Sequence, residues 1–387
     1  MMNNLLFASF FLLAGGIFTS VTVLGGQQVL LIAPACYFIF RAYNSGELKF
    51  SKSSWFLVGF FLISLFSLIL NLSDLAKPAK NFGQLRYLLA GVLSVLAFDH
   101  FIKITNKKRQ AFLVHTFLFS ILGVGLICLY QKIFLHQPRA KSLTDTLRYG
   151  YGMGMILPVL LGVMLRPQLF KMVNRKLLFA SFVFGLCGLY VSFTRGALLG
   201  FICAVPFVLI YWKKKAGIIA FVCSGLLVGA LGGFYLFGKG EIGNRYISSM
   251  NNKSDSMRRS QWESAYLGWK ERPVIGLGYS NFINHCIELK QKYSLSHQDY
   301  KGHAHNVFLE ILVGTGVLGL LFFLGWFFFW FHEMYKSSTE LAGLVIPFMV
   351  AFFVSGQFEV VLDANNATMI FAFYALSMAC KKQESLI

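Results

Sequence analysis

Charged residues are scarce in this chain of 387 residues. They make up 13% of the sequence, whereas 56% of the residues are hydrophobic and the mean hydropathy is +0.63. A soluble globular domain carries about a quarter charged residues, so the composition excludes that class and places the chain in a lipid bilayer.

Acidic residues are the rarest part of this charge, with 16 aspartates and glutamates against 35 lysines and arginines. The resulting formal charge of +19 would suggest a nucleic-acid partner in a soluble protein. In a membrane protein, lysine and arginine collect in cytoplasmic loops and at external cationic sites. We therefore expect no nucleic-acid partner.

The motifs of metal and nucleotide chemistry are missing. The seven cysteines show no Cys-x-x-Cys or Cys/His spacing and mostly lie in apolar runs, so we expect neither disulfides nor structural zinc. There is no Gly-rich phosphate loop, no serine nucleophile elbow and no Asp-x-Asp site for a nucleotide sugar. We expect no cofactor.

Long apolar runs divide the chain into about twelve candidate spanning helices. They cover residues 5–23, 27–40, 55–72, 83–98, 111–134, 149–165, 177–192, 196–212, 216–237, 307–331, 341–357 and 364–380. The first run lacks a basic flank and is followed at once by another, so we interpret it as a span and not as a cleaved signal peptide. The predicted fold is all-α, a polytopic membrane protein with one large external loop that contains short helices.

The orientation follows from the basic residues between the spans. With the N-terminus inside, seventeen lysines and arginines fall in cytoplasmic segments and eight in the short external ones. This bias predicts that both termini are cytoplasmic. The predicted parts are helices 1–9 in residues 1–237, the large loop in residues 238–306, and helices 10–12 with a short tail in residues 307–387.

The large loop is too long to be a simple connector, so we expect it to carry function. Its residues 256–270 predict an amphipathic helix. The residues that share one face at helical spacing are Trp262, Ala265, Tyr266 and Trp269. Arg258 projects from the same side, and Pro273 with the following glycines ends the helix in a turn.

Basic residues are predicted to gather at the external membrane surface. Arg195 lies in an almost loop-free hairpin, where an arginine is costly unless it is paired or has a role. Guanidinium groups match phosphate or pyrophosphate geometry, so an external anion is a plausible partner. The alternative is that these side chains only reach lipid headgroups. The other basic residues on this side are Arg258, Arg259, Arg139, Lys141, Arg148 and Arg86.

Two histidines, His303 and His305, stand where the loop re-enters the membrane. They could ligate a metal, but no further ligands follow at a known spacing. A neutral imidazole is otherwise the natural general base for a sugar hydroxyl, and interfacial histidines without a role are the third possibility. Nearby carboxylates are few, namely Glu310, Glu359 and Asp363. Cations with few acids favour a donor whose leaving group is already a lipid pyrophosphate.

These segments together resemble the bacterial O-antigen ligases. His305-Asn306, nine residues and then Gly316-Val317-Leu318-Gly319 are similar to the family's His-[Asn/Ser/Gln]-x9-Gly-x-x-Gly pattern. The Thr194-Arg195-Gly196 hairpin, Arg258 with Trp262, and the Pro-x-x-Gly-x-Gly turn that begins at Pro273 are similar to further family features. The specific resemblance covers residues 180–330.

The resemblance implies a glycosyltransferase of the bacterial inner membrane with a periplasmic active site. The donor would be O-antigen on undecaprenyl pyrophosphate and the acceptor the lipid A-core oligosaccharide, both embedded in membrane lipid, with no metal in the reaction. His305 would act as general base, and Arg195 and Arg258 would bind the pyrophosphate. The further substrate-binding candidates are Arg259, His303, Asn306, Arg139, Arg148, Arg86 and Glu310.

Other functions stay open. The same superfamily contains O-antigen polymerases and protein O-oligosaccharyltransferases, although the histidine pattern favours a ligase over a polymerase. A membrane carrier is the alternative from another class, and it would be supported by inverted repeats or paired broken helices. The sequence contains no convincing repeat, and its largest hydrophilic segment lies on one side only.

Overall fold

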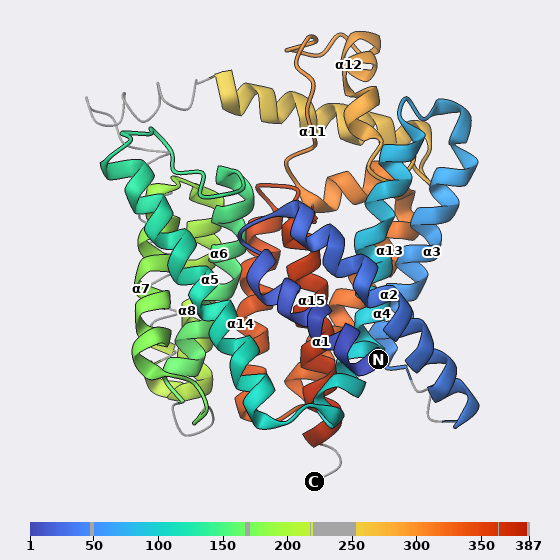
Figure 1. Ribbon diagram of the computed structural model, residues 1–387. Coiled ribbons are helices and arrows are strands. Elements are labelled where there is room, and N and C mark those ends of the chain that lie inside the picture. Colours follow the sequence, from blue (N-terminus) through green and yellow to red (C-terminus); the bar gives the residue numbers. More distant parts are fainter. Residues whose placement is uncertain (47–49, 167–170, 217, 220–252, 363, 385–387) are drawn as a thin grey trace.

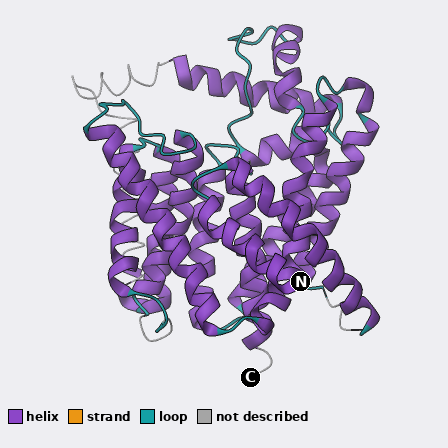
Figure 2. Ribbon diagram, in the orientation of Figure 1, coloured by secondary structure: helices purple, strands orange, loops and turns teal. Residues whose placement is uncertain are grey.

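The structure is a computed structural model that describes residues 1–46, 50–166, 171–216, 218–219, 253–362 and 364–384. Within these residues the regular secondary structure is helical, without a strand (Figure 2). The predicted all-α class is confirmed for this part of the chain.

The helices follow the predicted apolar runs closely. Those of the main bundle are α1 (Met2–Gly16), α2 (Val21–Asn44), α3 (Lys52–Leu70), α4 (Pro78–Ile104), α5 (Lys107–Ile133), α6 (Thr146–Met164), α7 (Arg175–Val191), α8 (Arg195–Trp212), α13 (Val307–Tyr335), α14 (Thr339–Gly356) and α15 (Ala364–Glu384). A short 3₁₀ turn, η1 (Leu72–Asp74), follows α3. The ninth predicted span, 216–237, lies almost entirely outside the described residues.

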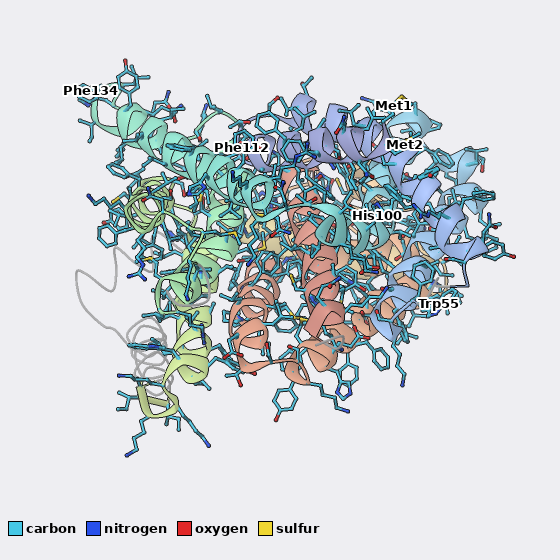
Figure 3. The ribbon with its side chains drawn as sticks, turned by 60° about the horizontal axis from the view of Figure 1, so that its bottom comes forward. Met1, Met2, Trp55, His100, Phe112 and Phe134 are labelled. Atoms are coloured by element: carbon cyan, nitrogen blue, oxygen red, sulfur yellow. The ribbon has the colours of Figure 1, made fainter. Side chains whose placement is uncertain are left out.

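The bundle has the dimensions and surface of a membrane protein. Seven helices, namely α2, α3, α5, α6, α8, α13 and α14, are long and apolar enough to cross a bilayer, and α4 would be an eighth as two bent segments. Large apolar side chains cover the outer surface, among them Phe112, Phe134 and Trp55 (Figure 3). A soluble protein does not expose apolar side chains so widely, so the protein is a polytopic helical membrane protein.

The helices of the bundle form two groups with two helices between them. Helices α5 to α8 lie on one side, and α2, α3, α4 and α13 lie on the other, with α14 and α15 between them (Figure 1). Helix α6 is largely covered by its neighbours, since thirteen of its nineteen residues are buried. Two further helices, α11 (Lys253–Glu271) and α12 (Phe282–Lys292), lie across one end of the bundle, and the C-terminus lies at the other end (Figure 1).

Helix α13 is broken at Gly316, which has φ +67° and ψ −169°. Only glycine adopts this backbone region readily. The turn after α11 fills the break, because Leu277 donates its backbone N–H to the Val313 carbonyl at 2.8 Å, and Val317 donates to Pro273 at 2.8 Å. Irregular backbone at membrane depth survives only where protein satisfies its polar groups, and this turn does so.

Helix α3 holds the same junction from its other side. The Ser67 hydroxyl lies 2.7 Å from the Ile275 carbonyl oxygen and 2.9 Å from that of Gly314. Arg272 forms an ion pair with Asp74 at 2.5 Å, and the bond to the guanidinium lowers the pKa of the Asp74 carboxyl. The turn of residues 273–278 and the broken segment of α13 around Gly316 therefore pack together. We call this contact the α11–α13 joint.

Helix α11 exists as predicted, but its aromatic face is not the face that it buries. Trp262 and Tyr266 are 39% and 45% exposed, whereas Ala265 is buried. The residues that pack inward are Ser260, Gln261, Ser264, Ala265 and Gly268. Helical spacing identified the amphipathic period correctly, but it could not tell that small side chains would allow α11 to pack closely on α12 and α13.

We predict that Gly316→Ala destabilises the protein. A Cβ at this position would stand 2.2 Å from the Val274 carbonyl atoms in a conformation that alanine avoids, so a loss of at least about 1–3 kcal/mol is expected. Thermal unfolding of the purified protein in detergent measures this loss. Gly123→Ala on α5, where no atom lies within 4 Å, is the control and should leave the midpoint unchanged or higher. Equal midpoints for the two variants would contradict the role of Gly316.

Candidate active site

The two histidines lie in the short loop between α12 and α13, and α12 anchors that loop. The buried Lys290 ammonium donates to the Tyr300 carbonyl at 2.8 Å, and its burial lowers the pKa of Lys290. The Gly302 N–H points to the Cys286 sulfur at 3.5 Å. The segment that leads to His303 is therefore held by polar contacts with α12.

Glu310, in the first turn of α13, holds the middle of the loop. Its carboxylate accepts from the Ala304 backbone N–H at 2.8 Å and lies 3.1 Å from His303 Nδ1. Asn306 caps α13, since its side-chain oxygen accepts from the Phe308 and Leu309 N–H groups at 2.9 and 3.1 Å. His305 lies between Ala304 and Asn306, and these hydrogen bonds hold both of its neighbours in place.

His305 is held in an unusual conformation against a carboxylate. Its φ is +47°, a left-handed value that non-glycine residues adopt rarely and that often marks a functional position. Its Nδ1 lies 3.0 and 3.1 Å from the two carboxylate oxygens of Glu359, in the segment between α14 and α15.

The electrostatics of this pair define the histidine tautomer. Burial raises the pKa of Glu359, but the hydrogen bond and charge of His305, with the nearby Arg258, outweigh that effect and leave the pKa below its ordinary value. An ionised carboxylate only accepts hydrogen bonds, so His305 Nδ1 must donate. In the neutral ring, Nε2 is then left as the basic nitrogen.

The pair borders a cavity of about 450 Å³. Five segments far apart in the sequence line it, from the starts of α4, α6, α12 and α13 and the segment before α15. The lining residues with ionisable side chains are Lys80, Asp145, Arg148, Tyr151, Tyr279, His303, His305, Glu310 and Glu359. Amide groups come from Asn81, Gln84, Asn284 and Asn366. A concave site with a few convergent polar groups is the form that substrate sites take.

The two arginines predicted to bind the leaving group, Arg258 and Arg195, belong to α11 and α8. Arg258, near the start of α11, interacts electrostatically with both Glu359 and Tyr151. Arg195 begins α8 and is exposed. The adjacent Gly196 lies so close to Tyr151 and Phe358 that an added Cβ would be 2.6 and 2.8 Å from their atoms. The hairpin is therefore fixed beside the residue that precedes Glu359.

The structure brings some of the predicted site residues together and separates others. His303, His305, Glu310 and Arg148 line the cavity, and Arg148 pairs with Asp145 at 3.1 Å. Asn306 adjoins it, and Arg139 donates to the Ser192 carbonyl of the Arg195 hairpin at 3.1 Å. Six of the predicted site residues do not line it, namely Arg195, Arg258, Arg139, Asn306, the exposed Arg259, and Arg86, which bonds the Tyr87 hydroxyl at 2.7 Å.

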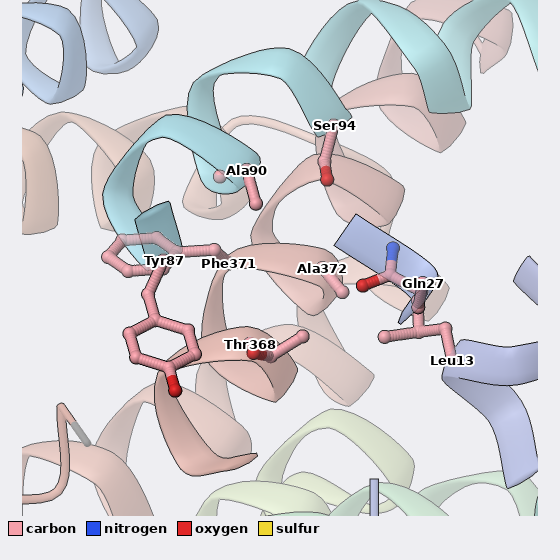
Figure 4. Close-up of a pocket in the computed structure, with 9 residues that line it drawn as sticks. Leu13, Gln27, Tyr87, Ala90, Ser94, Thr368, Phe371 and Ala372 are labelled. Atoms are coloured by element: carbon pink, nitrogen blue, oxygen red, sulfur yellow. The ribbon is translucent and has the colours of Figure 1, made fainter. Parts of the chain in front are cut away.

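Sequence reasoning did not assign a role to Glu359, Lys80, Gln84 or Tyr151. Glu359 had one usable signal, because it follows the predicted span 341–357 on the same predicted side of the membrane on which His305 precedes the span 307–331. The other three stand at helix starts that carry no motif. A second cavity, beside Gln27 and Thr368, has about 10 Å³, roughly the volume for one water, and carries no such constellation (Figure 4).

Metal ligands are not grouped in the described part of the chain. No three histidine, cysteine, aspartate or glutamate side chains there form a set that could hold an ion. His303 and His305 each face a carboxylate instead, at 3.1 and 3.0 Å.

These features define a helical membrane protein with an ionisable site at one end of its bundle. Residues 180–324 match the family model of the O-antigen ligases. This match confirms the resemblance found in the sequence, and it supports assignment to the O-antigen ligase and polymerase superfamily. No curated protein matches the chain.

We predict that Glu310→Ala loosens the histidine loop. The buried Ala304 N–H would lose its acceptor, which costs about 1–3 kcal/mol locally. Amide hydrogen exchange over residues 300–306 should rise severalfold or more. Glu288→Ala on α12, where the side chain is 77% exposed, is the matched control. Unchanged exchange in the Glu310 variant would show that the carboxylate does not hold this loop.

Proposed function

We propose that the protein is an O-antigen ligase, a glycosyltransferase that moves polysaccharide from undecaprenyl pyrophosphate to a hydroxyl of the lipid A-core oligosaccharide. The observation that carries the proposal is the His305–Glu359 pair, which borders the polar cavity. His305 lies in the segment 180–324 that matches the ligase family, and Glu359 reaches it from outside that segment. A base and a set of cations are the two elements that transfer from a lipid pyrophosphate needs.

The proposed topology has twelve spans in the bacterial inner membrane and both termini in the cytoplasm. The large loop of residues 238–306 and the active site then face the periplasm. Support comes from the basic bias of the predicted cytoplasmic segments, and from α11 and α12, which lie at the end of the bundle opposite to the C-terminus (Figure 1). Residues 1–237 and 307–387 would form the membrane-embedded parts on either side of the loop.

In the proposed reaction, His305 Nε2 accepts the proton of the acceptor hydroxyl as the hydroxyl oxygen attacks the anomeric carbon. The bond from that carbon to the pyrophosphate oxygen breaks, and the pyrophosphate carries the bonding electrons away. Arg195 and Arg258 bind this leaving group and stabilise its growing charge. Glu359 orients the imidazole and stabilises its protonated form, the role that a buried carboxylate has beside histidine in hydrolases.

The other predicted residues have supporting roles in this proposal. Arg139 would hold the Arg195 hairpin, and Arg148 and His303 would contact substrate in the cavity. Glu310 and Asn306 would position the histidine loop. Arg86 and Arg259 would reach the donor headgroup only at the rim, since neither lines the cavity.

We predict that His305→Ala abolishes transfer and that Glu359→Gln lowers the turnover rate by up to about 10⁴-fold. Glutamine presents an amide N–H to Nδ1, which favours the tautomer whose Nε2 carries a proton and cannot act as a base. Transfer is measured with purified protein, lipid-linked glycan and lipid A-core acceptor. Glu263→Gln on the exposed side of α11 is the control. Near-normal transfer by the His305 variant would remove the base assignment.

Deletion of the gene in its host tests the function itself. A ligase is expected to leave the core uncapped while long polymer accumulates on the lipid carrier, visible on a gel stained for core and blotted for O-antigen. A core bearing a single repeat unit would instead identify a polymerase. Unchanged lipopolysaccharide would contradict both assignments.

A further inference from the structure

Among the charged groups that line the cavity, Lys80 is the one without an opposite charge in the described part of the chain. Asp145 pairs with Arg148 at 3.1 Å and also caps α6. Glu310 and Glu359 each form hydrogen bonds with a histidine and with a backbone N–H group. Every lining carboxylate thus has a partner, and no contact of this kind involves Lys80.

The residues that α4 and α12 contribute to the lining include three amide side chains and no carboxylate. One turn further along α4 is Gln84, a partly buried side chain that makes no hydrogen bond within the described residues. Asn284 of α12 donates to Asn281 at 3.0 Å, which leaves its carbonyl oxygen as an acceptor. The buried Asn81 joins the two helices, since its amide donates to Ser280 at 3.0 Å.

Lys80 and Gln84 belong to another part of the bundle than Arg258 and Arg195. Arg258 of α11 interacts electrostatically with Glu359, and Arg195 begins α8, whereas Lys80 and Gln84 belong to α4 in the other half of the bundle (Figure 1). His305 borders the same cavity as Lys80 and Gln84. A displacement at carbon needs the leaving group and the incoming hydroxyl on opposite sides of the reacting atom, with the base beside the hydroxyl.

We propose that Lys80, Gln84 and Asn284 form the acceptor subsite and bind a phosphorylated sugar next to the hydroxyl that is glycosylated. This inference rests on the ligase function proposed above. The Lys80 ammonium binds the phosphate as a point charge, and the two amides bind sugar hydroxyls, whose donors and acceptors match an amide. The donor pyrophosphate is the other source of phosphate in the reaction, and the experiment separates the two.

The test uses the full-length protein in nanodiscs with lipid-linked glycan donor and two acceptors, lipid A-core as isolated and lipid A-core stripped of its phosphates. Lys80→Met keeps the apolar stem and removes the charge. It should raise the KM for the phosphorylated acceptor by about tenfold to a hundredfold. The donor KM, the turnover rate and the KM for the stripped acceptor should stay unchanged, and Gln84→Ala should raise both acceptor KM values severalfold.

Two variants serve as controls. Lys77→Met changes an exposed lysine at the cap of the same helix that does not line the cavity, and it should behave as wild type. Lys80→Arg keeps the charge and should retain a KM within a few-fold of wild type, which guards against a misfolded Lys80→Met protein.

Three results would overturn the subsite. A raised donor KM in Lys80→Met would mean that the lysine binds the pyrophosphate. An equal effect on the phosphorylated and stripped acceptors would mean that it recognises no phosphate. A wild-type protein that transfers glycan to neither acceptor would remove the acceptor subsite together with the ligase function, and this failure is distinct because it appears before any substitution.

Discussion

The break in α13 is the constraint on which the rest of the structure depends. A helix interrupted inside a bilayer leaves N–H and C=O groups that water cannot reach, so protein must supply their partners. The turn that begins at Pro273 supplies them through bonds to Val313 and Val317. Because α13 starts only nine residues before the break and α11 ends just before the turn, this contact fixes the histidine loop and α11 relative to each other.

Near the α11–α13 joint, each of three carboxylates holds one part of the site in place. Asp74 fastens Arg272 beside the turn, Glu310 holds the histidine loop, and Glu359 orients His305. With few acids available at this end of the bundle, a positive surplus remains on the arginines and on Lys80. That surplus suits anionic substrates.

Much of the fold was predictable, because apolar runs and turn residues are local signals. The limits of α3, α5 and α14 follow from such signals to within a few residues. The family pattern also located His305, but not the carboxylate that orients it. Glu359 lies 54 positions further along the chain, and it comes close because the end of α14 lies beside the start of α13, where the Asn306 amide donates to the Gln357 carbonyl at 3.4 Å.

The remaining differences have the same physical origin. Helical spacing put Trp262 and Ala265 on one face of α11, yet tertiary contacts bury Ala265 and leave Trp262 exposed. Gly316 and His305 belong to the same family pattern, so the pattern alone did not show that the two residues have different roles. Its φ and ψ show that it serves the joint, while His305 serves the site.

The hydrogen bonds of the cavity carboxylates also bear on the stereochemistry of the proposed glycosyl transfer. A retaining double displacement needs a carboxylate that is free to attack the anomeric carbon, with a second group about 5 Å away as acid and base. In the described cavity, both oxygens of Glu359 face His305, and Glu310 is bonded to the loop backbone. Asp145 is bonded to the start of α6 and to Arg148. A carboxylate that breaks these bonds to attack carbon would give up the contacts that hold the site. For the glycosyl transfer proposed above, a single displacement with inversion is therefore the mechanism that we expect.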